Sequence, residues 1–203
     1  MKWSFIPNLI TVLRVLLLFP LSYLLLQGEY HAAVIIFFIA GFSDALDGFL
    51  AKRFFGVSRF GAILDPLADK ALLVLTMAIL TYNQKLSWTL FATVAARDLY
   101  IVGGALYYHW RVGPFEMAPS LLSKFNTFIQ LSLVTLLLVS LSYLQLPPVL
   151  IQGLVLLTYL TTVTSGIHYT WVWGRKLRAE LATAASSALD QSDSRGEPPR
   201  RRK

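Results

Sequence analysis

The composition of this 203-residue chain argues against an ordinary water-soluble domain, because 56% of its residues are hydrophobic and only 14% are charged. A soluble domain averages about half apolar residues and about a quarter charged ones. The chain has no Cys, which excludes a disulfide framework, a thiolate metal site and a Cys nucleophile. The formal net charge of +7 does not indicate nucleic-acid binding. Much of that charge lies in short loops and in the C-terminal segment, where basic residues set membrane topology.

Six apolar stretches follow one another along the chain, each close to the roughly 20 residues that a helix needs to cross a bilayer. We therefore expect an all-α integral membrane protein with six transmembrane helices. They are predicted at residues 7–26, 32–51, 60–82, 86–108, 121–144 and 149–173. Pro20 is expected to kink the first helix, because its ring removes a backbone donor. The connections are short and show no repeat, so residues 1–174 are predicted to form one membrane domain.

The composition changes after Gly174, where a basic cluster is followed by a stretch rich in Ala, Ser, Asp, Pro and Arg. We expect a basic, disordered tail over residues 175–203, because this stretch has little apolar surface to bury. Six helices place both termini on one side of the membrane. In the loops on the opposite side, Lys85 is the only Lys or Arg residue. The positive-inside rule predicts that both termini are cytoplasmic. The N-terminus has neither a cleavage site nor an Arg- and Ser-rich transit segment, which favours a bacterial plasma membrane.

Four Asp residues stand where a membrane protein normally avoids charge. Asp44 and Asp47 are three residues apart near the end of the second predicted helix, and Asp65 and Asp69 are four apart near the start of the third. Each spacing places its pair on one helix face. Four carboxylates in a partly desolvated site repel one another unless a hard divalent cation holds them, and an all-oxygen ligand set favours Mg²⁺, Mn²⁺ or Ca²⁺. The alternative for each Asp is a helix cap or an ion pair with a basic neighbour (Lys52, Arg53 or Lys70), which does not explain all four together.

Small residues accompany these carboxylates: Gly48 and Ala51 follow Asp47, and Gly61 lies one turn before Asp65. They leave room for a ligand beside the backbone, or they allow a neighbouring helix to pack closely. Basic side chains at the same membrane level can meet phosphate groups; they are Lys52, Arg53 and Arg59. Metal ions, carboxylates and cations together favour phosphoryl chemistry, in which a carboxylate accepts the proton of an attacking hydroxyl.

Residues 44–51 (DALDGFLA), Gly61 and residues 65–69 (DPLAD) resemble the signature of the CDP-alcohol phosphatidyltransferases. The resemblance extends from Pro7 and Asn8, with Thr11 and Arg14, to residues 173–176. It implies six helices, a homodimer and a site open to the cytoplasmic leaflet. One position departs from the signature, because the family's Arg after Ala is Lys52 here. Lys offers diphosphate a point charge in place of a bidentate fork.

The resemblance also implies a reaction and a set of roles. The phosphatidyl group of CDP-diacylglycerol would pass to an alcohol, CMP would leave, and Mg²⁺ or Mn²⁺ would be the cofactor. Asp69 would act as the general base, and all four carboxylates would hold the metal ions (Asp44, Asp47, Asp65 and Asp69). Residues of the first three helices and of the loop after the second would bind the CDP-lipid (Asn8, Thr11, Asp44, Gly48, Ala51, Lys52 and Gly61).

Two further segments bear on the acceptor alcohol. Residues 65–70 (DPLADK) resemble the glycerol-type branch, which comprises phosphatidylglycerophosphate synthases and CMP-forming cardiolipin synthases. Residues 123–130 (SKFNTFIQ) and the pair Arg97-Asp98 look closer to the cardiolipin synthases. Basic residues in or near the membrane are candidate acceptor-binding groups, namely Arg97, Arg111 and Lys124. The alternative for Arg97 and Lys124 is pairing with Asp98 or an anchoring role at the membrane surface.

Two other interpretations stay open. The chain is also compatible with a member of the same family that uses another polar alcohol, such as an inositol phosphate. A small membrane transporter is the alternative from a different class. It would place polar sites near the middle of the bilayer and often contain repeated halves. The acids here gather at one face of the membrane and no repeat is visible, so an enzyme is the stronger prediction.

Overall fold

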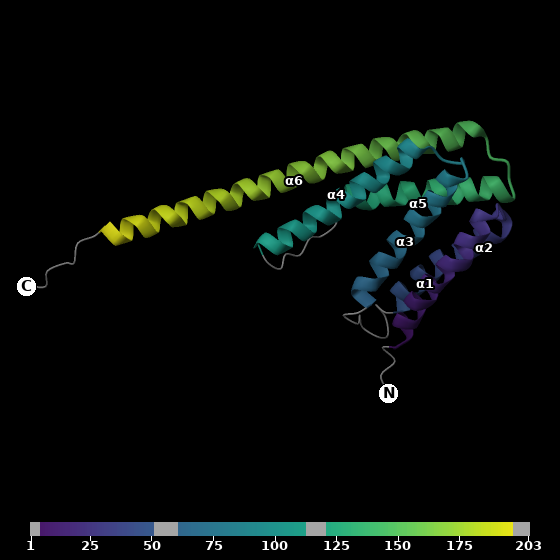
Figure 1. The fold of residues 1–203 in the computed structure, drawn as a ribbon, viewed down its shortest axis with the longest axis horizontal. Helices are drawn as coiled ribbons and strands as arrows, with labels where there is room; N and C mark the ends of the chain where they lie inside the picture. The colour runs from purple at the N-terminus through teal and green to yellow at the C-terminus, as the bar shows by residue number, and fades with distance from the viewer. Residues whose placement is uncertain (1–4, 51–60, 113–120, 197–203) are drawn as a thin grey trace, which may run out of the picture.

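The computed structural model is all-α, and the residues that it describes form no strand (Figure 1). It describes residues 5–50, 61–112 and 121–196, and within these the side chains of residues 12–43, 68–104, 121–172 and 175. The helices are α1 (Phe5–Leu26), α2 (Tyr30–Leu50), α3 (Gly61–Tyr82), α4 (Trp88–Val112), α5 (Leu121–Ser142) and α6 (Pro148–Gly196). The six predicted helices are confirmed as helices, and α1 continues through Pro20 without interruption.

The helices run back and forth, so their ends gather at two sides of the molecule. The turns that join α1 to α2, α3 to α4 and α5 to α6 lie together at the right of Figure 1. The end of α2 and the start of α3 lie at the lower end, beside the start of α1. Contacts along the bundle join α1 to α2 and α3, and join α6 to α4 and α5. The fold therefore brings the two acidic helix ends to one side.

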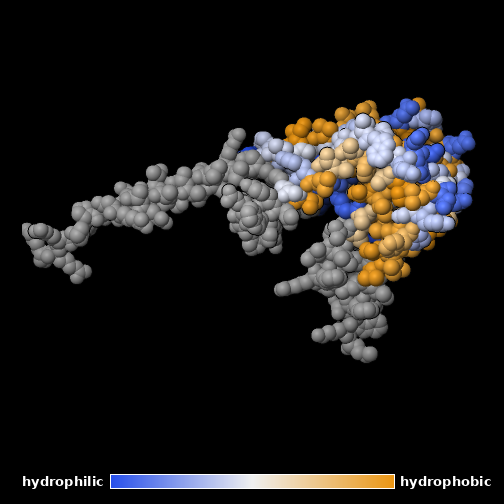
Figure 2. All heavy atoms as spheres, in the orientation of Figure 1, coloured by the Kyte–Doolittle hydropathy of each residue, from blue (hydrophilic) through white to orange (hydrophobic). Residues whose placement is uncertain are grey.

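The interior is mainly apolar, with some buried polar and charged side chains, and large apolar side chains also lie on the outer surface. The core contains side chains that recur every three or four residues along a helix, such as Leu73, Met77 and Leu80 of α3. Large apolar side chains also face outward, among them Phe19, Phe42 and Leu99, which are 66–73% exposed. Figure 2 shows hydrophobic residues among hydrophilic ones on the visible face. Among the described residues, Leu121–Ser142 and Pro148–Val172 are long and apolar enough to cross a membrane, whereas the apolar helices Val12–Leu26 and Tyr30–Ser43 are shorter.

Helix α6 extends well beyond the boundary expected at Gly174. It continues to Gly196 and projects from the bundle as a single rod (Figure 1). The expectation of a disordered tail is therefore wrong for residues 175–196. Residues 176–189 are rich in Ala and Leu, which are strong helix formers. They also follow a helix that already exists, so they need no separate nucleation.

Two of the turns end their helices in the same way. After α1, the amide of Glu29 donates to the carbonyl of Leu24 at 2.9 Å, and Gly28 has a φ of 76°. After α3, the amide of Lys85 donates to the carbonyl of Leu80 at 2.8 Å, and Gln84 has a φ of 60°. Both are Schellman turns, in which one residue adopts the left-handed conformation. Glycine adopts it freely, whereas Gln84 is strained.

This difference predicts opposite effects of two substitutions. Gln84→Gly should stabilise the protein by about 0.5 kcal/mol, because it removes the left-handed strain while making the unfolded chain more flexible. Gly28→Ala should destabilise it by about 1 kcal/mol for strain alone, since the space around Gly28 is open. Thermal unfolding in detergent measures both. Gln84→Ala is the matched control and should change little, and a less stable Gln84→Gly variant would contradict the assignment.

Candidate active site

The predicted metal ligands lie on two neighbouring helix ends. Asp44 and Asp47 are in the last two turns of α2, and Asp65 and Asp69 are in the first three turns of α3. These ends meet at the lower side of the bundle in Figure 1. The backbone thus brings both pairs to the same region. Of the four carboxylates, only that of Asp69 belongs to the described side chains.

The predicted CDP-lipid residues lie on the same side of the fold where they are described. Asn8 and Thr11 are in the first two turns of α1, Gly48 is in the last turn of α2, and Gly61 is the first residue of α3. The side chains of Asn8 and Thr11 are not among the described side chains. Two further predicted residues lie entirely outside the described residues, namely Ala51 and Lys52.

A buried arginine holds the one described carboxylate of this set. Nη1 of Arg14 on α1 donates to Oδ1 of Asp69 on α3 at 2.5 Å. The Arg14 side chain is fully buried, whereas that of Asp69 is 44% exposed. A buried guanidinium requires an anionic partner, so this ion pair fixes α1 against α3 and orients the carboxylate. The exposure of Asp69 keeps the carboxylate within reach of a substrate.

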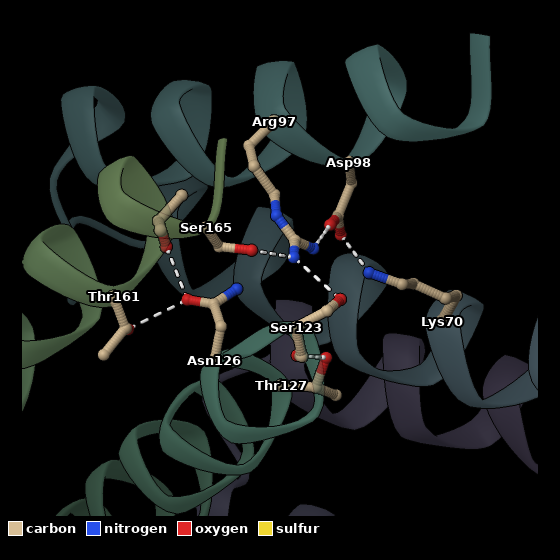
Figure 3. Close-up of polar contacts among 9 residues, drawn as sticks. Lys70, Arg97, Asp98, Ser123, Asn126, Thr127, Thr161 and Ser165 are labelled. Atoms are coloured by element: carbon tan, nitrogen blue, oxygen red, sulfur yellow. Dashed lines mark hydrogen bonds and ion pairs between the residues drawn. The ribbon is translucent and has the colours of Figure 1, made fainter. Parts of the chain in front are cut away.

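A second polar network joins the other helices (Figure 3). Nζ of Lys70 on α3 pairs with Oδ2 of Asp98 on α4, and Nη1 of Arg97 donates to the other oxygen of Asp98 at 2.7 Å. Nη2 of Arg97 donates to Ser123 of α5 at 2.8 Å and also to Ser165 of α6. One carboxylate is therefore shared by two cations, and four helices are connected through them.

These contacts bear on the predicted acceptor-binding residues. Arg97 is 7% exposed, and both of its terminal nitrogens have partners within the protein, so its predicted pairing with Asp98 is observed. Lys124 is exposed on α5, next to Ser123 in the sequence. Arg111 lies in the last turn of α4, and its side chain is outside the description. Binding of an acceptor by these residues remains a prediction.

Sequence reasoning missed two partners in this region. Arg14 carried no assigned role, although a lone arginine within an apolar helix is a signal of function or pairing. Ser165 carried no signal, because a serine in a membrane helix often bonds to its own backbone. Lys70 is one of the basic neighbours named as an alternative partner for the four acids, and its described partner is Asp98 of α4.

The residue types present fit a hard divalent cation. The predicted ligands are all carboxylates, and their helix ends come together at one side of the bundle. Among the described side chains there is no group of three or more His, Cys, Asp or Glu residues that could hold a metal ion. Three of the four predicted ligands lie outside that set, namely Asp44, Asp47 and Asp65.

Fold and site together define an all-α protein with apolar helices and a carboxylate-rich polar region at one end. Comparison with known families gives the class a name. Residues 4–165 match the family model described as CDP-alcohol phosphatidyltransferase. Since this match covers most of the chain, the protein belongs to the CDP-alcohol phosphatidyltransferase family.

Several curated proteins are similar to the chain. The CMP-forming cardiolipin synthase of Rattus norvegicus is 32% identical over 190 residues, which cover 86% of this chain and 62% of the relative. A CDP-diacylglycerol–glycerol-3-phosphate 3-phosphatidyltransferase of Aquifex aeolicus is 27% identical over 168 residues, covering 81% of this chain and 93% of the relative. The Escherichia coli (strain K12) protein with that description is 42% identical over 101 residues, covering 47% and 56%. The chain thus spans less than two thirds of the cardiolipin synthase it matches.

The shared carboxylate predicts a large effect of one neutral substitution. Asp98→Asn should destabilise the protein on the order of 3 kcal/mol, because it leaves the buried Arg97 and its neighbour Lys70 without their anion. Lys70→Met should cost less, since Arg97 still neutralises Asp98. Thermal unfolding of the double variant should show a loss of stability about 1–2 kcal/mol smaller than the sum of the two single losses. Additive effects would show that Lys70 and Asp98 do not interact.

Proposed function

We propose that this protein is a metal-dependent phosphatidyltransferase that moves the phosphatidyl group of CDP-diacylglycerol to a glycerol-type alcohol. The observation that carries the proposal is the position of Asp69. This carboxylate lies in the family signature, is 44% exposed, and is oriented by the buried Arg14. It belongs to the third turn of α3, and the start of α3 lies with the end of α2 at one side of the bundle.

The reaction follows from these residues. The acceptor hydroxyl gives its proton to Asp69 while its oxygen attacks the phosphorus that carries the diacylglycerol group. The bond between that phosphorus and the oxygen of CMP breaks, and CMP leaves. Arg14 keeps the carboxylate in one orientation, so less freedom is lost when the hydroxyl binds. Divalent cations held by the four carboxylates would neutralise charge on the diphosphate oxygens (Asp44, Asp47, Asp65 and Asp69).

The substrate is amphipathic, and the proposed site suits its two parts. The cytidine and diphosphate would lie against the polar helix ends, where Asn8, Thr11, Gly48 and Gly61 occur, with Ala51 and Lys52 beyond the end of α2. The acyl chains would remain in the lipid beside the apolar outer faces of the helices. Lys52 would meet the diphosphate as a single charge, where the family signature has an arginine.

We further propose that all six helices cross the membrane and that both termini face the cytoplasm. Three observations support this topology. The described turns lie together at one side, the short loops of that side contain only Lys85 as a basic residue, and Lys and Arg gather in the opposite segments. The membrane would be the plasma membrane of a bacterium, and the protein would act there as a homodimer, as the family resemblance implies.

Phosphatidylglycerol is the acceptor that we propose first, with cardiolipin as the product. The cardiolipin synthase of rat aligns with 86% of this chain, and the segment 123–130 carries the motif that resembles this branch. Glycerol 3-phosphate is the second candidate, because the Aquifex relative named for that acceptor matches this chain over 93% of its own length. Either acceptor would meet Lys124, which is exposed on α5, and Arg111 in the last turn of α4. Arg97 would contribute through its hydrogen bond to Ser123, the sequence neighbour of Lys124.

Purified protein in liposomes provides the test of this activity. With CDP-diacylglycerol, Mg²⁺ or Mn²⁺ and phosphatidylglycerol, we expect CMP release and cardiolipin, both measured by mass spectrometry. Excess chelator should stop turnover, and added metal should restore it. Phosphatidylglycerophosphate formed only from glycerol 3-phosphate would favour the second acceptor. Use of inositol phosphate alone would contradict the assignment to the glycerol-type branch. If no alcohol leads to CMP release, the proposed phosphatidyltransferase activity is contradicted.

The general base is tested by removing its ability to accept a proton. Asp69→Asn should lower the rate of CMP release by about 10²–10⁴-fold, because an amide does not take the proton of the attacking hydroxyl. Asp190→Asn is the matched control, since it lies outside the family match and should leave the rate unchanged. Asp69→Asn should also lower the midpoint of thermal unfolding, because the buried Arg14 loses this anion. The rates are therefore compared at a temperature where circular dichroism shows equal helix content in both variants. An Asp69→Asn variant within a few-fold of the wild-type rate would remove Asp69 from this role.

A further inference from the structure

A line of polar side chains runs along the contact between α5 and α6 into the apolar part of the bundle. At its first level Arg97 bridges Ser123 and Ser165, and at the second the amide oxygen of Asn126 accepts hydrogen bonds from two threonines of α6 (Figure 3). These donors are Thr161 at 2.9 Å and Thr162 at 3.0 Å.

The register of the two helices extends this line by one more level. Moving along α5 from Ser123 to Asn126 moves the partner on α6 back from Ser165 to Thr162, as expected for antiparallel helices. One further turn reaches Gln130 on α5, which the same register places level with Thr158 on α6. Both of these side chains are fully buried. The third level therefore lies deeper among the apolar residues than the other two.

Three polar atoms on this line have no hydrogen-bond partner among the residues that the structure describes. They are Nδ2 of Asn126 and both Nε2 and Oε1 of Gln130. In Figure 3 the amide nitrogen of Asn126 extends away from Thr161, on the opposite side from the bonded oxygen. The hydroxyl of Thr158 donates to the carbonyl of Leu154 at 2.8 Å, so its oxygen can still accept a hydrogen bond.

An unpaired amide is costly in this position. The next buried residues of α5 are apolar, namely Leu133 and Val134, and both are fully buried. Burial of an amide among such residues without a partner is strongly unfavourable, and lipid supplies no donor or acceptor to replace one. A molecule that both donates and accepts, and that is small enough to fit between two packed helices, would satisfy the amides of Asn126 and Gln130.

We propose that Asn126, Gln130 and Thr158 form a buried binding site for water between α5 and α6. Water is the ligand because it donates and accepts at once, and a stable buried water needs two to four polar partners. The bound water joins Gln130 to the rest of the line and so extends the Lys70–Asp98–Arg97 network toward the middle of the bundle. It also holds α5 against α6 below the level where Arg97 bridges them. The site is independent of the proposed catalytic activity.

Replacement of the amide by an apolar side chain of similar length tests the site. If water occupies it, Gln130→Met loses satisfied hydrogen bonds, and the midpoint of thermal unfolding should fall by about 4 °C. Gln152→Met is the matched control, because Gln152 is exposed on α6, and its midpoint should not change. An unchanged or higher midpoint for Gln130→Met would overturn the proposal, since removal of an unsatisfied amide is neutral or stabilising.

A fall in stability has a second possible origin in altered packing, so water contact is measured in the wild-type protein as well. Solid-state NMR of the ¹⁵N-labelled protein in liposomes records magnetisation transfer from water to side-chain amides, with the Gln130 signal assigned by its loss in Gln130→Met. We expect the Gln130 amide to receive magnetisation at a rate close to that of the exposed Gln152. A rate as slow as that of the buried backbone amide of Leu133 would overturn the proposal, whatever the stability of the variant.

Discussion

The structure depends on one constraint, which is that charge placed among apolar helices must be paired. Arg14 is fully buried and meets this constraint through Asp69, and Arg97 meets it through Asp98. Two of the ion pairs, Arg14–Asp69 and Lys70–Asp98, join different helices. The hydrophobic effect alone would not select these contacts, because apolar contacts are non-directional. The ion pairs therefore decide which faces of α1, α3 and α4 meet. Breaking one of them leaves an uncompensated buried charge, so the arrangement is strongly selected once the helices pack.

The same constraint separates structural charge from catalytic charge. The terminal nitrogens of Arg97 donate hydrogen bonds to Asp98 and to one serine on each of two other helices. The main contribution of Arg97 is therefore to hold α4, α5 and α6 in register. Asp69 differs, because its side chain is nearly half exposed while its partner is buried. An oriented and accessible carboxylate is the form that a general base requires. The proposed chemistry thus uses the exposed member of a pair whose buried member fixes its position.

The helices and the positions of the four acids along them were predictable from the sequence. The contacts between helices were not, for a physical reason. The apolar runs predicted the helices, since their length and hydrophobicity are local properties. They also predicted that Asp44 and Asp47 lie near the end of one helix, and Asp65 and Asp69 near the start of the next. The pairing of Arg14 with Asp69 spans 55 positions, so it depends on helix neighbours that local patterns do not specify. The predicted tail failed for a different reason. Composition indicated little surface to bury, but it did not account for a helix that propagates onward from α6.

The central claim is that the acidic ends of α2 and α3 form one metal site that includes Asp69. Crystals grown with Mn²⁺ allow a direct measurement, because the anomalous signal of manganese locates the ion without reference to activity. The account predicts anomalous peaks between these two helix ends, with an oxygen of Asp69 among the ligands, and their weakening in Asp44→Asn. Crystals of an active, Mn²⁺-dependent protein in which the peaks lie elsewhere would contradict it.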